Sequence, residues 1–119
     1  MNVQRGDVVL VNFPFSSGTG AKLRPALVVQ SDHNNPRLAS TIVAMITKTT
    51  HRATREPTQL LIDITTPEGR QTGLVVTSAI ACENLFTVEQ RLITRKIGHL
   101  PSSLIAQVDV CLKASLALK

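Results

Sequence analysis

The stretch FSSGTGAKLRPALVVQ, from Phe15 to Gln30, joins a polar loop to an apolar strand. Ser16–Lys22 is small and polar, and its two glycines permit positive φ angles. Ala26–Val29 is a short apolar run bounded by turn residues, which predicts a buried strand. Arg24 lies at the junction, and Pro25 restricts it to an extended conformation. In this position Arg24 can donate hydrogen bonds to a bound oxyanion. The alternative is an ordinary surface arginine at the end of a hairpin.

Apolar runs on both sides of this stretch predict further strands. Val8–Phe13, after a turn at Arg5–Asp7, is typical of a strand buried on both faces or in a barrel. Ile42–Thr47 is rich in β-branched residues and predicts a third strand. The other strand-like segments are Gln59–Ile64, Gly73–Val76, Ala79–Cys82, Leu85–Val88 and Arg91–Ile97, with a bulge or corner expected at Thr77–Ser78.

After Pro101, which suits the first position of a helix, the apolar period changes from two to about 3.6 residues. The predicted inner face of this helix comprises Leu104, Val108, Cys111, Leu112 and Ser115, widened by Ile105 and Leu116. Short strands closed by one C-terminal helix, without repeat or linker, predict a single domain over residues 1–119. Its expected fold is mainly β, a small barrel with a C-terminal helix.

The composition restricts the class of partner. A net charge of +5 and a pI of about 9.9 favour an anionic partner, nucleic acid before a membrane surface. Trp and Tyr are absent and Phe occurs three times, so few aromatic side chains are available for stacking against nucleic-acid bases. Cys82 and Cys111 lie in apolar contexts, which predicts buried thiols in a reducing cytosol. No signal peptide or membrane span is expected.

Two polar features complete a candidate phosphate site. The three histidines lack metal-ligand spacing, and the glycine loop lacks a nucleotide-binding signature, so neither a metal nor a cofactor is expected. Lys48–Thr58 contains almost no apolar residue and predicts a solvated, mobile basic loop with a functional role. If the barrel is right, Arg24 and Thr47 both lie at strand ends beside polar loops. An arginine fork and a hydroxyl can hold a phosphodiester without a metal ion, although Thr47 alone reads as an ordinary strand residue.

Short blocks follow one another along nearly the whole chain: Arg5–Val11, Leu23–Val29, Ile42–Thr47, Thr72–Leu74, Ser78, Ala81–Leu85, Thr87–Val88 and the terminal helix. In this order and spacing, anchored by the Gly6-Asp7 and Arg24-Pro25 pairs, the sequence resembles the MazF/PemK family of toxin endoribonucleases. The resemblance implies a compact SH3-like barrel that forms a homodimer. It implies metal-independent cleavage of single-stranded RNA, mostly messenger RNA, by attack of the 2′-hydroxyl, which leaves a 2′,3′-cyclic phosphate and a 5′-hydroxyl. It also implies a cognate antitoxin whose acidic tail blocks the RNA groove.

The resemblance assigns roles to individual residues. Arg24 and Thr47 match the family's arginine and threonine at the scissile phosphate, and Ser78 matches a frequent serine of the central strand. Glu83 falls where some members carry an aspartate that acts as general base. In those members an arginine precedes the aspartate by two residues, whereas this chain has Ala81, so a structural role for Glu83 remains an alternative.

The identities of the acid and base stay open between Glu83, His51 and Arg52. Basic and polar residues beside the catalytic pair are expected to guide RNA into a groove shared by two subunits. The predicted RNA-binding set is Thr19, Lys22, Lys48, His51, Arg52, Arg55 and Ser78. Two other readings remain: a gyrase-poisoning toxin of the same barrel type, and an inactive member that only binds RNA.

Overall fold

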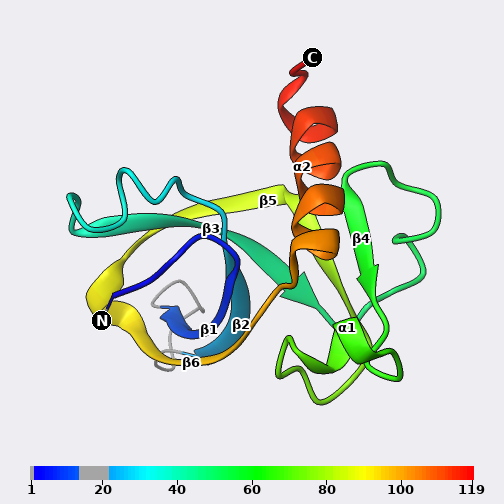
Figure 1. Cartoon of the computed structure of the whole chain (residues 1–119), viewed down its shortest axis with the longest axis horizontal. Helices are drawn as coiled ribbons and strands as arrows, with labels where there is room; N and C mark the ends of the chain where they lie inside the picture. The colour runs from blue at the N-terminus through cyan, green and yellow to red at the C-terminus, as the bar shows by residue number, and fades with distance from the viewer. Residues whose placement is uncertain (1, 14–21) are drawn as a thin grey trace.

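The computed structural model describes residues 2–13 and 22–119, which form one curled antiparallel sheet and a long C-terminal helix (Figure 1). The sheet order is β4-β5-β3-β2-β1-β6. Its strands are β1 (Asp7–Phe13), β2 (Lys22–Val28), β3 (Ser40–Thr47), β4 (Gln59–Ile62), β5 (Ser78–Glu89) and β6 (Ile93–His99). The helical elements are α1 (Pro67–Arg70), the 3₁₀ turn η1 (Gln90–Leu92) and α2 (Ser102–Leu116). The mainly β fold with a C-terminal helix is confirmed, although β4 and β6 remain the two edges of an open sheet.

Both faces of the sheet are buried, and successive side chains of its central strands alternate between the two apolar clusters that cover these faces. On β1, Val8 belongs to the apolar cluster that α2 covers, whereas Val9 and Val11 belong to a cluster on the opposite face. On β3, Ala44 and Val43 divide between the same two clusters. The prediction that the first strand is buried on both faces is therefore confirmed, and the curled sheet encloses its second core itself.

Helix α2 packs beside β4 and β5, as Figure 1 shows. Val108 and Cys111 are buried in the first cluster, and the Ser115 Oγ donates a hydrogen bond to the Cys82 carbonyl at 2.8 Å. Two details of the prediction are wrong. Pro101 is the residue before the first helical turn, and Leu116 is 52% exposed because the last turn of α2 extends beyond the sheet.

Strand β2 begins four residues earlier than expected, at Lys22. Arg24 therefore lies inside an extended strand, paired with Val11 of β1, and not at a junction before it. The strand tolerates Pro25 because its ladder with β3 starts only at Ala26, after the proline.

The region between β4 and β6 differs most from expectation. The predicted strand Gly73–Val76 is absent; Gly73 has a φ of +74° in a turn, and Val75 is 85% exposed. Ala79–Cys82 and Leu85–Val88 form one strand, β5, which begins at Ser78. Because Gly73–Val76 is not a strand, Thr77–Ser78 does not separate two strands. The strand is instead irregular farther along. Ala44 of β3 pairs with Leu85, but the next residue, Met45, pairs with Ala81, which leaves Cys82–Asn84 as a bulge.

Three other boundaries shift by a few residues. The strand predicted over Gln59–Ile64 ends at Ile62. The strand predicted over Arg91–Ile97 runs from Ile93 to His99 because residues 90–92 form the 3₁₀ turn.

The loop between β3 and β4 is exposed, as expected for Lys48–Thr58. Its backbone folds into consecutive turns, in which the Ala53 N–H donates to the Thr50 carbonyl at 3.0 Å and the Glu56 N–H to the Arg52 carbonyl at 2.8 Å. The cations of this loop therefore sit on a structured backbone.

Both cysteines are free and buried, as predicted. Burial, the neighbouring Cys111 thiol and the Glu83 carboxylate raise the pKa of Cys82 to about 12, so this thiol is protonated and unreactive at neutral pH. In the part of the chain that the structure describes, no helix is long and apolar enough to span a membrane.

Candidate active site

An open groove of about 700 Å³ lies where β2, β3 and β5 come together. Strand β2 contributes its first residues, β3 its last, and β5 both its start and its bulge. The lining residues are Lys22, Leu23, Arg24, Pro25, Met45, Ile46, Thr47, Lys48, Thr49, Ser78, Asn84 and Phe86. Five of the predicted RNA-binding or catalytic residues thus line one groove: Lys22, Arg24, Thr47, Lys48 and Ser78.

Arg24 and Thr47 lie across from one another on neighbouring strands. The β2–β3 ladder pairs Ala26 with Met45, and Arg24 and Thr47 each lie two residues beyond this pair, towards the groove. Because strand side chains alternate, both project from the same face of the sheet. Residues far apart in the sequence are thereby brought together by strand register.

Both side chains keep hydrogen-bonding capacity for a ligand. Arg24 is exposed, and its side chain forms no ion pair or hydrogen bond with any residue the structure describes. The Thr47 Oγ accepts a hydrogen bond from the Thr49 N–H at 3.1 Å, which leaves its own proton available for donation. A guanidinium fork and a hydroxyl on one face can bind adjacent oxygens of a phosphate.

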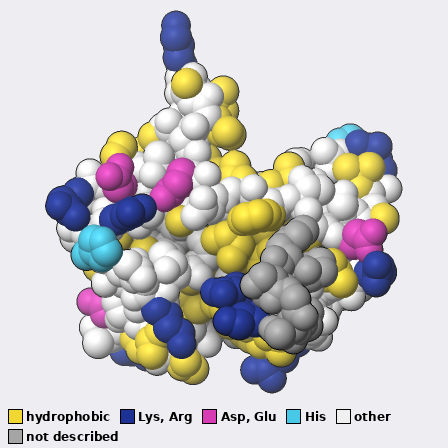
Figure 2. All heavy atoms as spheres, turned by 180° about the vertical axis from the view of Figure 1, so that it is seen from behind, with side chains coloured by type: hydrophobic (Ala, Val, Ile, Leu, Met, Phe, Trp, Pro, Cys, Tyr) yellow, Lys and Arg dark blue, Asp and Glu magenta, His cyan; other side chains and the backbone are white. Residues whose placement is uncertain are grey.

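The groove is basic and partly apolar. Lys22, Arg24 and Lys48 contribute positive charge, and none of the described lining residues is acidic. Leu23 and Phe86 are 57% and 39% exposed, so apolar surface lies beside the cations. Figure 2 shows one face of the molecule where hydrophobic side chains gather next to Lys and Arg side chains. Such a surface suits a flexible polyanion that also carries flat, apolar groups.

Ser78 lines the groove but is 2% exposed. Its Oγ donates a hydrogen bond to the Val76 carbonyl at 2.9 Å. The hydroxyl proton is therefore already in use, and Ser78 can offer a ligand only the acceptor side of its oxygen.

Glu83 lies in the β5 bulge, beside the groove residue Asn84, but does not line the groove itself. One carboxylate oxygen accepts a hydrogen bond from the Thr58 hydroxyl at 3.1 Å, and the other accepts one from the Gln59 Nε2 at 2.7 Å. Partial burial raises the pKa of Glu83, but these hydrogen bonds and the charge of Arg52 outweigh it, so the net pKa is lowered. Glu83 is thus ionised and directed towards the start of β4.

The remaining predicted residues lie outside the groove lining. His51, Arg52 and Arg55 are exposed on the loop between β3 and β4, whose first residues, Lys48 and Thr49, do line the groove. Thr19 lies outside the residues that the structure describes.

Sequence reasoning did not single out Asn84, Phe86 or Met45 as groove residues. Asn84 and Phe86 project from the same side of β5 because they are two residues apart, and Phe86 is held edge-on by Phe13 with ring centroids 6.0 Å apart. A signal was present: the polar pair Glu83-Asn84 interrupts an otherwise apolar strand, as bulges often do.

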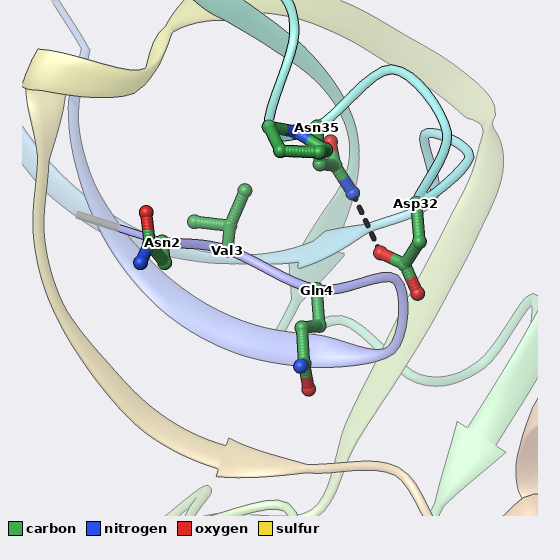
Figure 3. Close-up of a pocket in the computed structure, with 6 residues that line it drawn as sticks. Asn2, Val3, Gln4, Asp32 and Asn35 are labelled. Atoms are coloured by element: carbon green, nitrogen blue, oxygen red, sulfur yellow. Dashed lines mark hydrogen bonds between the residues drawn. The ribbon is translucent and has the colours of Figure 1, made fainter.

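A smaller hollow of about 320 Å³ lies near the opposite end of β2, between the N-terminal segment and the loop after β2 (Figure 3). It is lined by Asn2, Val3, Gln4, Asp32, Asn35 and Pro36, and none of the predicted site residues falls in it. Within residues 2–13 and 22–119, no three His, Cys, Asp or Glu side chains gather closely enough to hold a metal ion.

Comparisons with known proteins agree with this architecture. EndoA, an endoribonuclease of Bacillus subtilis, is 34% identical over 119 residues, covering 99% of this chain and 97% of that protein. The endoribonuclease MazF6 of Mycobacterium tuberculosis is 33% identical and is covered over its full length. Among solved structures, the M. tuberculosis toxin MazF-mt6 superposes with a TM-score of 0.76 at 22% identity, over 95% of this chain and 98% of that one. A MazE–MazF structure from Deinococcus radiodurans gives 0.73 at 17% identity, with 100% and 99% covered.

Residues 4–116 match the family model described as PemK-like, MazF-like toxin of type II toxin–antitoxin systems. The match spans most of the chain and includes every strand of the sheet. The chain therefore belongs to the PemK/MazF family of toxins.

Proposed function

We propose that this protein is an endoribonuclease toxin that cleaves single-stranded RNA, messenger RNA foremost. One observation carries the proposal: Arg24 and Thr47 share one face of neighbouring strands in an open basic groove, with side-chain donors that no other described residue uses. Relatives at 33–34% identity over nearly the whole chain are named endoribonucleases, which supports the same reaction class.

The proposed reaction needs no metal ion or cofactor. The ribose 2′-oxygen loses its proton and attacks the adjacent phosphorus, and the bond from phosphorus to the 5′-oxygen of the next nucleotide breaks. The products are a 2′,3′-cyclic phosphate and a 5′-hydroxyl. Arg24 and Thr47 donate hydrogen bonds to the phosphoryl oxygens as negative charge grows on them, and Lys22 and Lys48 hold the neighbouring phosphates.

None of the described residues that line the groove carries a carboxylate or an imidazole. The group that accepts the proton of the 2′-hydroxyl is therefore sought outside this lining. His51 and Arg52 lie on the adjoining loop and remain candidates for the acid and base, together with Glu83. A general base of this kind contributes about 10²–10⁴ in rate.

The proposal extends to the partners. A second copy of the chain forms a homodimer, and a cognate antitoxin neutralises the toxin in the cytoplasm by laying an acidic segment into the basic groove. A mycobacterial endoribonuclease with the same fold is described in complex with its cognate antitoxin, and the Deinococcus structure is described as MazE–MazF. The net charge of +5 suits an acidic inhibitor as well as RNA.

The decisive experiment incubates the purified protein with a long RNA in the presence of EDTA and maps the new ends. Cuts at one short sequence that leave 5′-hydroxyl ends are expected. Intact RNA, together with inhibition of purified gyrase, would identify a non-enzymatic toxin of the same barrel type. Intact RNA that nevertheless shifts in a binding assay would identify an inactive RNA-binding member.

A further inference from the structure

We propose that Glu83 is a positioning residue that fastens the basic loop between β3 and β4 to the β5 bulge, and that it does not act as the general base. This inference rests on the proposed endoribonuclease activity, because the groove that it shapes is the proposed RNA site. It resolves the two roles that the sequence leaves open for this carboxylate.

The bulge divides three successive residues among three environments. Cys82 is fully buried in the core beneath α2, and its carbonyl accepts the hydrogen bond from Ser115. Asn84 lines the groove. Glu83, between them, is directed to the residues that join the basic loop to β4. The bulge is therefore anchored in the core on one side and exposes a groove residue on the other.

Three hydrogen bonds fasten the end of the loop to this bulge. The Cys82 N–H donates to the Thr58 carbonyl at 2.9 Å, the Thr58 hydroxyl donates to Glu83 at 3.1 Å, and the Gln59 Nε2 donates to Glu83 at 2.7 Å. Each carboxylate oxygen therefore accepts one of these bonds, and both side-chain donors lie at the end of the loop and the start of β4, not in the groove. A base for the 2′-hydroxyl would need a free lone pair directed into the groove.

Gln59 makes the contact with Glu83 hard to replace. Gln59 is 8% exposed, and its Oε1 is buried without a hydrogen-bond partner among the described residues. The amide is therefore held through its nitrogen alone, by Glu83. Removing the carboxylate leaves both polar ends of a buried amide unsatisfied, which favours movement of Gln59 and of the loop before it.

The same loop reaches the groove at its other end. Lys48 and Thr49 line the groove, and the loop then carries His51, Arg52 and Arg55 before it returns to Thr58. The positive charge of Arg52 also acts on Glu83. Glu83 thus fixes the far end of a segment whose near end contacts the proposed RNA path, and its loss should weaken substrate binding more than chemistry.

Two substitutions of Glu83 separate positioning from base catalysis. Glu83→Gln can still accept from Gln59 through its oxygen and donate to the Thr58 hydroxyl, but it cannot take a proton. Glu83→Ala removes both contacts. We expect Glu83→Ala to raise KM for RNA about tenfold with a much smaller change in kcat, and Glu83→Gln to restore KM towards the wild-type value.

Glu89→Ala is the matched control, because Glu89 lies on the same strand and its carboxylate forms an ion pair with Arg91, away from the groove. A base would give the opposite pattern for Glu83. Both substitutions would lower kcat by about 10²–10⁴ with little change in KM, and the acidic limb of the kcat–pH profile would disappear. That result would overturn the proposal.

Amide hydrogen exchange gives a readout that does not depend on activity. Faster exchange across residues 48–58 is expected in Glu83→Ala, with exchange near the wild-type rate in Glu83→Gln and Glu89→Ala. If Glu83→Ala does not fold, Thr58→Val removes one of the two contacts and should show a smaller acceleration. Equal exchange in all variants would refute the positioning role. Failure of the wild-type protein to cleave RNA would refute the proposed function while leaving this exchange test decisive for the loop.

Discussion

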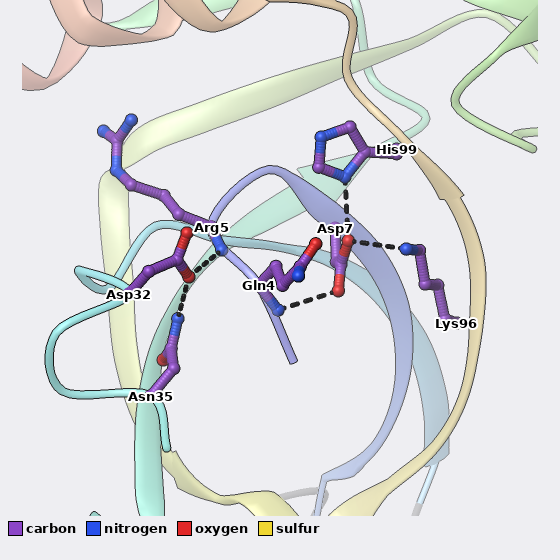
Figure 4. Close-up of polar contacts among 7 residues, drawn as sticks. All are labelled: Gln4, Arg5, Asp7, Asp32, Asn35, Lys96 and His99. Atoms are coloured by element: carbon purple, nitrogen blue, oxygen red, sulfur yellow. Dashed lines mark hydrogen bonds and ion pairs between the residues drawn. The ribbon is translucent and has the colours of Figure 1, made fainter. Parts of the chain in front are cut away.

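The Nδ1–H of His99 donates a hydrogen bond of 2.8 Å to the Asp7 carboxylate, which joins the first residue of β1 to the last residue of β6 (Figure 4). The same Asp7 oxygen pairs with the Lys96 ammonium at 2.9 Å, and the other oxygen accepts the Gln4 N–H at 2.8 Å. Asp7 is 1% exposed, so this carboxylate is a buried charge satisfied by three donors. It fastens edge strand β6 to the neighbouring strand β1.

This arrangement predicts acid-sensitive stability. Burial raises the pKa of Asp7, but the hydrogen bonds from His99, Gln4 and Lys96 more than compensate and leave it below the ordinary aspartate pKa of 3.8. The unfolded chain therefore takes up the proton first. The stabilisation is complete well above pH 3.8 and is lost as the pH falls through the lower pKa of the folded state.

We expect Asp7→Asn to lose about 1–3 kcal/mol of unfolding free energy at neutral pH. The variant should also lose less additional stability than the wild type between about pH 5 and about pH 3. Urea unfolding at several pH values measures both effects. Glu56→Gln, at an exposed loop position, serves as the control. Parallel acid profiles for Asp7→Asn and the wild type would contradict the assignment.

Gly98 on β6 is a second point where the edge strand is fixed. A Cβ atom at this position would lie 2.3 Å from the backbone carbon and oxygen of Thr72 and 2.6 Å from the Gln71 carbonyl oxygen. These atoms cannot yield easily, because the His99 N–H donates to the Gln71 carbonyl at 3.1 Å. Gly98→Ala should lower the unfolding free energy by at least about 3 kcal/mol, measured by urea denaturation.

Arg95→Ala tests whether this loss reflects the contact and not the strand in general. Arg95 is exposed on the same strand, so its substitution should change stability by less than about 0.5 kcal/mol. Comparable losses in the two variants would show that the close approach of Gly98 to Thr72 is not the cause.

The sequence was informative where one local pattern determined the structure. Val8–Phe13 is apolar at nearly every position, a pattern typical of a strand covered on both faces. The apolar period of α2 likewise identified Val108 and Cys111 as core. The same period failed at Leu116, because periodicity carries no information about where the sheet beneath the helix ends.

The groove was partly predictable for the same reason. Arg24 and Thr47 flank polar loops, and an antiparallel register brings such strand ends together. The polar pair Glu83-Asn84 signals an interruption of β5, but the geometry of the bulge at Cys82–Asn84 could not be deduced, because it arises from a mismatch between pairing on the two sides of Ala44 and Met45. Such a mismatch depends on the pairing of whole strands, which local sequence does not encode. Hence the direction of Glu83 could not be deduced.

Arg24 should be required for cleavage but not for folding. Arg24 is exposed and its guanidinium forms no hydrogen bond or ion pair with other described residues, so Arg24→Ala should leave the melting temperature unchanged. Loss of a preorganised donor at the phosphate should reduce kcat by about 10²–10³. Single-turnover cleavage of a long RNA measures this effect, again with Arg95→Ala as a control. Near-normal cleavage by Arg24→Ala would remove the basis of the proposed site.

Arg24→Lys refines the same prediction. Lysine keeps the positive charge but offers a point charge in place of a planar fork. We expect binding of RNA to be largely retained while kcat stays well below the wild-type value, because the two phosphoryl oxygens are no longer bridged. Full activity in Arg24→Lys would mean that charge alone is sufficient at this position.

The cations of the groove should determine how strongly RNA binding depends on salt. For single strands, each phosphate neutralised adds about 0.7 to the slope of log K against log salt concentration. Lys22 and Lys48 both line the groove, so the double substitution to alanine should reduce the slope by about 1.4. Arg91→Ala should leave the slope unchanged, because Arg91 pairs with Glu89 away from the groove. Fluorescence anisotropy with a 2′-O-methyl oligonucleotide measures binding without cleavage, since the attacking hydroxyl is blocked. If the double variant and the wild type share one slope, RNA does not follow this groove.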